Sequence, residues 1–301
     1  MTGQTVALTG ATGFIGRRTT LALQQAGHVV RAIARPGRAS AVEDGATVIE
    51  GAMEDAQAQA TLLEGADVLV HNAVDWKVLK AGDMSAHLRN NLCAAIDLFD
   101  AAARKGCPIV FVSSVAVHHH MLEAFNSRID HVHPARPGNL YGALKAALEA
   151  HLWAMHTRYD MGFVALRPAA VYGIDPTPTR SIGWPLVQRL SEGRSWGRAG
   201  GGKFVHVNDV AAAIAAAVDH RRRDGRLYHL ADCYARWSDW EAMAVDVMDM
   251  EMTVEHVSPD APKNQFVVDD LASDLGVSLD RGHDGIREHL ANLVDHWRSM
   301  P

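Results

Sequence analysis

A short apolar run followed by a glycine-rich turn decides the fold of this chain. The stretch is Val6-Ala7-Leu8-Thr9-Gly10-Ala11-Thr12-Gly13-Phe14-Ile15-Gly16. Residues 6–8 predict a buried strand, and residues 16–26 predict a helix. In this context, glycines allow a tight turn, close approach of the backbone to a pyrophosphate and close packing of helix on strand. The stretch therefore predicts a dinucleotide site. Its expected contacts are Gly10, Thr12, Gly13, Phe14, Ile15 and Gly16.

Strands and helices alternate along the first two thirds of the chain. The expected strands are residues 6–8, 29–34, 47–49, 68–71, 109–112 and 164–166. The expected helices between them include residues 16–26, 57–63, 91–104 and 142–158. Several strands are apolar on consecutive residues, which indicates a parallel sheet that is buried on both faces. The alternation predicts an α/β fold with a doubly wound parallel sheet of the Rossmann type.

The character of the sequence changes after Tyr172. Residues 173–202 are rich in Pro, Gly and Trp, and apolar patterning resumes at residue 204. We expect residues 1–172 to form the dinucleotide-binding Rossmann domain, with residues 203–232 returning to it. The strand 204–207, the helix 209–219 and the strand 227–230 belong to that return. Residues 173–202 and 233–301, with helices at 237–250 and 285–297, are expected to form a smaller discontinuous C-terminal lobe that binds substrate.

Bulk composition limits the classes of partner. The chain has 301 residues and a formal net charge of -6, which argues against a nucleic-acid-binding surface. The basic run Arg221-Arg222-Arg223 follows an Ala-rich stretch and is typical of a solvated helix C-terminus. Three scattered cysteines fit a reducing cytoplasm. We expect a cytoplasmic protein, because no apolar run approaches the roughly 20 residues that span a bilayer.

The residues after the second strand bear on the identity of the dinucleotide. An NAD site usually places a carboxylate about 20 residues past the turn, on the ribose hydroxyls. Here the stretch reads Ala32-Ile33-Ala34-Arg35-Pro36-Gly37-Arg38 and has no carboxylate. A guanidinium suits a 2′-phosphate, so Arg35, with Arg38 nearby, favours NADP. A surface role for Arg35 leaves NAD as the alternative.

Three polar side chains indicate chemistry beside this dinucleotide. Tyr141 and Lys145 are four residues apart in an expected helix and therefore share a face. A nearby ammonium is expected to lower the pKa of the phenol, which suits Tyr141 to proton transfer. Ser113 and Ser114 close the strand 109–112 at the edge of the sheet, where a serine can hold the reacting oxygen.

These motifs together resemble the extended short-chain dehydrogenase/reductases of the NAD-dependent epimerase/dehydratase family. The resemblance covers nearly the whole chain, including Asp67–Ala73, Leu166-Arg167-Pro168 and His206–Val210. It implies that Ser114, Tyr141 and Lys145 are catalytic, with Lys145 also binding the nicotinamide ribose. Further cofactor contacts are implied for Ala73, Val74, Pro168 and Val171, and for the backbone near Met53. A homodimer that packs through residues 91–104 and 142–158 is also implied.

Asp75-Trp76-Lys77 and residues 175–179 look most like the dihydroflavonol-4-reductase-like branch of this family. Ala170 stands where sugar-nucleotide epimerases usually carry Asn, which lowers the expectation of a sugar-nucleotide substrate. Candidate substrate contacts are Asp75, Trp76, His118, Arg180 and Trp184. Packing or surface roles are the alternatives for these side chains. No metal site is expected, because the histidines show no ligand spacing typical of a metal.

The first expectation is therefore an NADP(H)-dependent oxidoreductase that reduces a carbonyl or oxidises an alcohol on a small organic substrate. The alternative is a sugar or sugar-nucleotide epimerase or dehydratase that recycles its own cofactor. A non-enzymatic dinucleotide sensor is the third possibility. The presence of Ser114, Tyr141 and Lys145 argues against it, because a sensor needs no proton relay.

Overall fold

A seven-stranded parallel sheet forms the centre of the molecule. The computed structural model describes residues 3–220 and 224–300. The strand order is β10-β7-β5-β4-β1-β2-β3, and each neighbouring pair is parallel. The strands are β1 (Thr5–Thr9), β2 (Val29–Ala34), β3 (Thr47–Glu50), β4 (Val68–His71), β5 (Ile109–Val112), β7 (Phe163–Pro168) and β10 (Asp224–Leu230). The predicted doubly wound sheet is confirmed. The basic run Arg221-Arg222-Arg223 lies outside the described residues.

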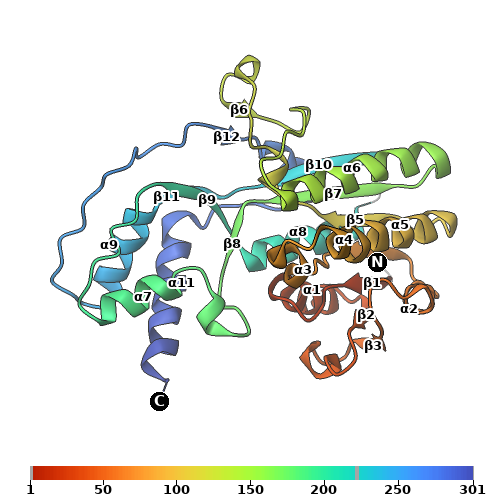
Figure 1. Cartoon of the computed structure of the whole chain (residues 1–301), viewed down its shortest axis with the longest axis horizontal. Helices are drawn as coiled ribbons and strands as arrows, with labels where there is room; N and C mark the ends of the chain where they lie inside the picture. Colours follow the sequence, from red (N-terminus) through yellow and green to blue (C-terminus); the bar gives the residue numbers. More distant parts are fainter. Residues whose placement is uncertain (1–2, 221–223, 301) are drawn as a thin grey trace.

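Helices cover both faces of this sheet (Figure 1). One face carries α1 (Phe14–Gln25), α8 (Val207–Asp219) and α10 (Asp269–Leu275), and the other carries α2 (Ala56–Leu62), α5 (Ala94–Arg104) and α6 (Leu140–Tyr159). Consecutive residues of β1 enter different cores, because side chains alternate across a strand. Val6 and Leu8 pack on the α1 side, and Ala7 packs on the α5 side. This explains the unbroken apolar runs of the sequence.

A smaller lobe lies beside one end of the sheet (Figure 1). It contains a three-stranded sheet of β11 (Cys233–Arg236), β9 (Gly201–His206) and β8 (Ala170–Tyr172), together with helices α7 (Trp184–Ser191), α9 (Trp237–Val247) and α11 (Gly282–Arg298). Trp240 is fully buried in its core. The strand expected at 204–207 pairs here and not in the main sheet, whereas α8 and β10 do return to the main sheet. The sequence of β9 predicts a strand but does not identify the sheet that the strand joins.

Several short elements complete the fold. They are α3 (Trp76–Ala81), α4 (Met84–His87), the π-helical turn Leu88–Cys93, the 3₁₀ turns Ala39–Ala41, Val115–Val117, Glu123–Phe125 and Pro178–Arg180, and strands β6 (Arg128–Ile129) and β12 (Gln265–Phe266). No helix among the described residues is long and apolar enough to cross a membrane.

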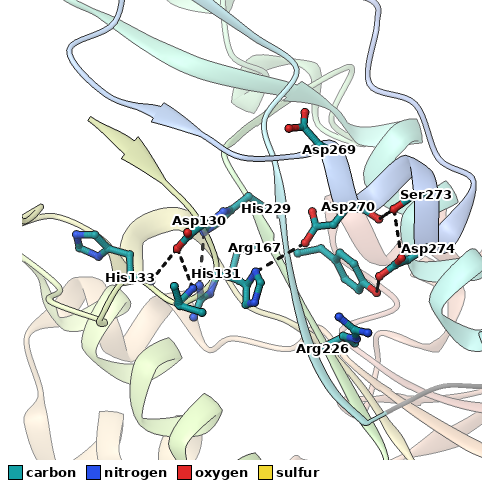
Figure 2. Close-up of polar contacts among 12 residues, drawn as sticks. Asp130, His131, His133, Arg167, Arg226, His229, Asp269, Asp270, Ser273 and Asp274 are labelled. Carbon is teal, nitrogen blue, oxygen red and sulfur yellow. Dashed lines mark hydrogen bonds and ion pairs between the residues drawn. The ribbon is translucent and has the colours of Figure 1, made fainter. Parts of the chain in front are cut away.

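The segment that precedes α10 is tied to the loop after Ser114. Strand β12 pairs with β6 in parallel, so that Phe266 lies opposite Ile129. Arg128 Nη2 lies 3.0 Å from Asp269 Oδ2. His131 Nδ1 lies 3.9 Å from Asp270 Oδ2 (Figure 2). These contacts bring a segment from the end of the chain back over the C-terminal edge of the main sheet.

A buried ion pair joins α6 to the main sheet. Arg167 on β7 donates through Nε and Nη2 to the two carboxylate oxygens of Glu149 on α6, at 2.9 and 2.7 Å. The hydroxyl of Ser113, directly after β5, donates to the same carboxylate at 2.6 Å. Both charged side chains are 5% exposed. The contact fixes the helix that carries Tyr141 and Lys145 against the edge of the sheet that carries Ser114.

Two buried imidazoles extend this network. Arg167 Nη1 lies 3.1 Å from His118 Nε2 and 3.5 Å from His229 Nε2, and the two Nε2 atoms lie 3.1 Å apart. Figure 2 shows Arg167 and His229 close together at the end of this network. Burial, assisted by the Arg167 charge, lowers the pKa of His118 to about 3 and that of His229 to about 2. Both imidazoles are therefore neutral at pH 7.

Replacing Arg167→Met tests the ion pair. The change leaves the Glu149 carboxylate buried without its cation, so we expect the free energy of unfolding to fall by roughly 3–5 kcal/mol in urea titrations. The double variant Arg167→Met with Glu149→Met should recover much of this loss. Arg128→Met removes an exposed pair and should change stability by at most about 1 kcal/mol. An Arg167 variant that is no less stable than the Arg128 variant would contradict this role.

The imidazole pair makes stability sensitive to acid. Between pH 6.5 and about 3, His118 is protonated in the unfolded chain but neutral in the folded protein. The free energy of unfolding therefore falls as the pH falls through this window. Between pH 7 and pH 4, we expect the free energy of unfolding of the unsubstituted protein to fall by more than that of His118→Gln. The difference should be on the order of 2–3 kcal/mol. The exposed His119→Gln is the matched control and should retain the full loss. Equal slopes for all three proteins would refute the prediction.

Candidate functional site

One large cavity joins the glycine turn to the serine and tyrosine. It has a volume of about 1130 Å³ and runs along the C-terminal edge of the main sheet. Gly10, Gly13 and Ile15 line one part of it, and Ser114 and Tyr141 line another. Residues far apart in the sequence meet here because the carboxyl ends of parallel strands lie at one edge.

The glycines of the turn fit their predicted roles. Gly10 has a φ of +76°, and a Cβ at this position would lie 2.9 Å from the backbone nitrogen of Ala73. A Cβ at Gly16 would lie 2.0 Å from the carbonyl oxygen of Gly10. Gly16 packs under the turn and is not among the lining residues of the cavity, so its role is close packing. Thr12, Gly13, Phe14 and Ile15 do line the cavity.

The N-terminus of α1 is open toward this cavity. Gly13 is its N-cap residue, and neither a described side-chain cap nor an acidic residue occupies its first turn. Free backbone N–H groups at a helix N-terminus bind phosphate well, because they donate hydrogen bonds and the helix dipole favours a negative charge. The turn and helix therefore fit the pyrophosphate of a dinucleotide.

Thr9 holds the next strand against the turn. Its Oγ1 accepts hydrogen bonds from the backbone nitrogens of Asn72 and Ala73 at 3.1 and 3.2 Å, and it lies 3.0 Å from His71 Nδ1. Burial lowers the pKa of His71 to about 3, so the imidazole is neutral and can accept the threonine proton. Ala73 and Val74 line the cavity as predicted from the family resemblance.

At the end of the cavity near β2, the two predicted arginines are placed differently. Arg35 lines the cavity, and its Nη2 lies 3.3 Å from Asp75 Oδ2 with 61% of the side chain exposed. Arg38 is exposed and is not among the lining residues, because the chain turns away after Gly37. The expectation that Arg38 helps to bind the dinucleotide is not supported by this geometry. Met53 lines the cavity beside Gly51 and Ala52.

Ser114 and Tyr141 share the opposite part of the cavity. Ser114 Oγ accepts a hydrogen bond from the backbone nitrogen of Ala116 at 3.1 Å and lies 3.5 Å from the Pro168 carbonyl oxygen. Tyr141 lies in the first turn of α6, which Asn139 caps by accepting a hydrogen bond from Gly142 at 2.8 Å. Pro168 itself contacts Ser114 but is not among the lining residues, whereas Val171 is.

The electrostatics of the tyrosine differ from the sequence expectation. Burial raises the pKa of Tyr141, and its side-chain hydrogen bond with Ser114 only partly opposes this. Lys145 is 1% exposed and donates from Nζ to the Val112 carbonyl oxygen at 2.7 Å. Burial lowers the pKa of Lys145 to about 7, although Glu149 opposes this shift. The prediction of a lowered tyrosine pKa was wrong, because desolvation of the phenol dominates. Lys145 is not a lining residue, so its contact with the ribose stays a prediction.

Three of the five candidate substrate residues line the cavity. They are Asp75, Trp76 and His118. The Asp75 side chain also accepts hydrogen bonds from the backbone of Lys77 and Val78 and so caps α3. The ring of Trp76 lies 4.7 Å from that of Tyr141 at an interplanar angle of 31°. The His118 ring is already engaged by Arg167 and His229.

The other two candidates lie elsewhere. Trp184 is 5% exposed in the core of the lobe, where its ring packs edge-on against Trp297 at 5.4 Å. Arg180 is exposed on the 3₁₀ turn Pro178–Arg180, and neither residue is among the lining residues of the cavity. The structure does not bring these two expected substrate contacts to the cavity, because Trp184 is buried on the apolar face of α7 and Arg180 lies on a surface turn.

The sequence analysis missed several lining residues. They are Asn72, Lys77, Asn139, His119, Met121, Lys203 and Phe266. Asn139 precedes a helix, where Asn is a preferred cap, so its position was open to prediction. Phe266 reaches the cavity only through the pairing of β12 with β6, which has no local sequence pattern. In residues 3–220 and 224–300, no group of three or more His, Cys, Asp or Glu side chains is suited to hold a metal ion.

Curated relatives of this chain include enzymes of several activities. A UDP-glucose 4-epimerase of Azospirillum brasilense is 27% identical over 330 residues, covering 99% of this chain and 91% of that protein. A ceramide reductase of Caulobacter vibrioides is 29% identical over 213 residues, covering 70% of this chain and 60% of that protein. A polyketide synthase-nonribosomal peptide synthetase hybrid of Aspergillus japonicus is 31% identical over 251 residues. This match covers 71% of this chain but only 6% of that protein.

Solved structures share the fold over the whole chain. The UDP-N-acetylglucosamine 4-epimerase of Methanobrevibacter ruminantium, in complex with UDP-N-acetylmuramic acid, has a TM-score of 0.80 at 21% identity and is covered to 99% in both chains. The UDP-glucose 4-epimerase of Thermus thermophilus, in complex with NAD, has a TM-score of 0.77 at 22% identity, with 99% and 100% coverage. At these identities the likeness shows the fold.

The family model for the NAD dependent epimerase/dehydratase family matches residues 6–231. This span contains the glycine turn, Ser114, Tyr141 and Lys145, and it ends just after β10. The cofactor of this protein is a nicotinamide dinucleotide. The chain belongs to the NAD-dependent epimerase/dehydratase family, and it is an NAD(P)-dependent enzyme of the extended short-chain dehydrogenase/reductase type.

Proposed function

We propose that this enzyme is an epimerase or dehydratase that acts on a sugar or sugar nucleotide and restores its own cofactor in each turnover. One observation carries the proposal: a single cavity contains both the phosphate-binding turn at Gly10–Ile15 and the pair Ser114 and Tyr141. The names of the full-length relative and the structural neighbours support this reading over net reduction, which was the first expectation from the sequence.

The residues of the chain supply binding, orientation and proton transfer. A nicotinamide dinucleotide held by the glycine turn would supply the acceptor and donor of a hydride for a substrate carbinol carbon. Tyr141 takes the hydroxyl proton as the C–O bond becomes a carbonyl, and it gives the proton back when the hydride returns. Ser114 donates a hydrogen bond that holds the reacting oxygen. The Nζ of Lys145 lies 5.7 Å from the centroid of the Tyr141 ring, and the charged form of this lysine stabilises a phenolate at Tyr141.

The replacement Tyr141→Phe tests this assignment in a sealed assay with cofactor-loaded enzyme and no added dinucleotide. With UDP-glucose as the first substrate, we expect the unsubstituted enzyme to form an isomer or dehydrated product without lasting change in absorbance at 340 nm. Because Tyr141→Phe removes the proton carrier, kcat should fall by about 10²–10⁴-fold with an unchanged Kd for the dinucleotide.

Tyr159→Phe, at the far end of the same helix, is the matched control and should keep full turnover. Turnover by Tyr141→Phe at the control rate would refute the mechanism. The second candidate is a net carbonyl reductase, which would form product from a carbonyl substrate only with equimolar loss of added reduced cofactor. A ceramide reductase among the relatives and the packing of Trp76 on Tyr141, which gives the cavity an apolar wall, favour this candidate.

We further propose that NADP is the preferred dinucleotide. Arg35 is the cation at the end of the cavity near β2, and its guanidinium can bind a 2′-phosphate with two parallel hydrogen bonds. The ion pair with Asp75 holds the guanidinium beside the cavity. The neighbour solved with NAD supports the alternative, NAD. We also expect a homodimer that packs through α5 and α6, a prediction open to light scattering.

Arg35→Ala tests the choice of dinucleotide. If Arg35 binds the 2′-phosphate, the Kd for NADPH should rise by roughly 10–100-fold while the Kd for NADH is unchanged, measured by quenching of tryptophan fluorescence. Arg38→Ala, outside the cavity, should change neither. An unsubstituted enzyme that prefers NADH, or equal effects of Arg35→Ala on both dinucleotides, would assign the site to NAD and contradict the proposal.

A further inference from the structure

Lys203 is a half-buried cation in the wall of the cavity. It lies on β9, where side chains alternate between the two faces of the strand. The next residue, Phe204, packs in the core of the lobe, and Val205 packs in the core beside α8. Lys203 therefore shares the face of Val205 and lines the cavity.

Lys203 has an aromatic neighbour but no carboxylate partner among residues 3–220 and 224–300. Its Nζ lies 5.3 Å from the centroid of the Phe266 ring. No ion pair joins it to a carboxylate in the part of the chain that the structure describes. Burial lowers the pKa of Lys203 without a compensating charge. A cation that is partly desolvated and lacks a counter-ion is unfavourable. An anionic ligand beside Lys203 would supply the missing counter-ion.

The charges of the cavity are divided between its two parts. The carboxylates among the described lining residues are Glu54 and Asp75. Glu54 follows β3 on the dinucleotide side, and Asp75 is already paired with Arg35. The part around Lys203 has a different lining. The Phe266 ring is a neighbour of both Lys203 Nζ and the His118 ring, whose centroid lies 6.1 Å from that of Phe266. Lys203, Phe266 and His118 all line the cavity, and His118 follows Ser114 by four residues.

We propose that Lys203 binds an anionic group of the substrate, a phosphate or a carboxylate, and thereby selects charged over neutral substrates. Phe266 restricts water on one side of the ammonium and so strengthens its attraction for an anion. The position is supplied by β9 and β12, outside the elements that carry Ser114 and Tyr141. The inference rests on the proposed function only in assuming that the substrate occupies this cavity.

The test measures binding without turnover. Isothermal titration on protein saturated with dinucleotide uses three probes: UDP-glucose for a phosphate, D-glucuronate for a carboxylate and D-glucose as the neutral sugar. The protein is used unsubstituted and as Lys203→Met, Lys203→Arg and Lys105→Met. Lys105 is an exposed lysine at the end of α5, outside the cavity, and serves as the matched control.

We expect at least one anionic probe to bind more tightly than glucose, and Lys203→Met to raise its Kd by roughly 10–100-fold. Lys203→Arg should restore most of the affinity, Lys105→Met should change it by less than about twofold, and the binding of glucose should be unaffected. A loss confined to UDP-glucose identifies a phosphate, and a loss confined to glucuronate identifies a carboxylate.

Three results would overturn the inference. The first is an unsubstituted protein that binds neither anion more tightly than glucose. The second is a Lys203→Met protein that binds both anions normally. The third is weakened dinucleotide binding by Lys203→Met, which would make Lys203 a cofactor contact. Failure of the proposed reaction can be distinguished from failure of this inference, because anion binding is measured without turnover. Tyr141→Phe retains Lys203 and should bind the anionic probes even if no variant shows turnover.

Discussion

The buried ion pair between Glu149 and Arg167 is the contact on which the site depends. Glu149 lies on α6, eight residues after Tyr141, and Arg167 lies near the end of β7. The same carboxylate accepts a hydrogen bond from the hydroxyl of Ser113, which precedes Ser114. One charged group therefore fixes a helix, a strand and a strand end relative to one another. Because an unpaired buried charge is strongly unfavourable, the three elements have one stable arrangement.

This arrangement sets the electrostatics of Lys145 and Tyr141. Lys145 lies one helical turn before Glu149 and is buried, with its Nζ bound to the Val112 carbonyl oxygen. Its ammonium is held under Tyr141 at 5.7 Å from the ring centroid. The pKa of Lys145 near 7 and the raised pKa of Tyr141 have the same cause, which is exclusion of water. Burial of the phenol favours the protonated form of Tyr141.

Much of the fold could be predicted from the sequence because its determinants are local. Consecutive apolar residues identified the strands, and the glycine spacing located the turn on which β1 meets α1. The same reasoning brought Ser114 and Tyr141 to one cavity, because strand ends of a parallel sheet share an edge. Local patterns could not place β9, whose partners β8 and β11 are distant in the chain.

Side-chain surroundings were the least predictable part of the site. Trp184 was expected to line the cavity, but α7 packs against α11 and buries its ring in the core of the lobe. Lys203 and Phe266 escaped notice because they meet only through two short strands from different parts of the chain. The sign of the Tyr141 pKa shift depends on burial, which spacing alone does not reveal.

A crystal structure of the enzyme with its dinucleotide tests the central claim most directly. The account predicts that the pyrophosphate lies on the N-terminus of α1 at Gly13. It also predicts that the nicotinamide ring lies within contact distance of Tyr141 and Ser114, with the Glu149–Arg167 pair intact. A dinucleotide bound with its nicotinamide ring toward Arg35, or outside this cavity, would contradict the account.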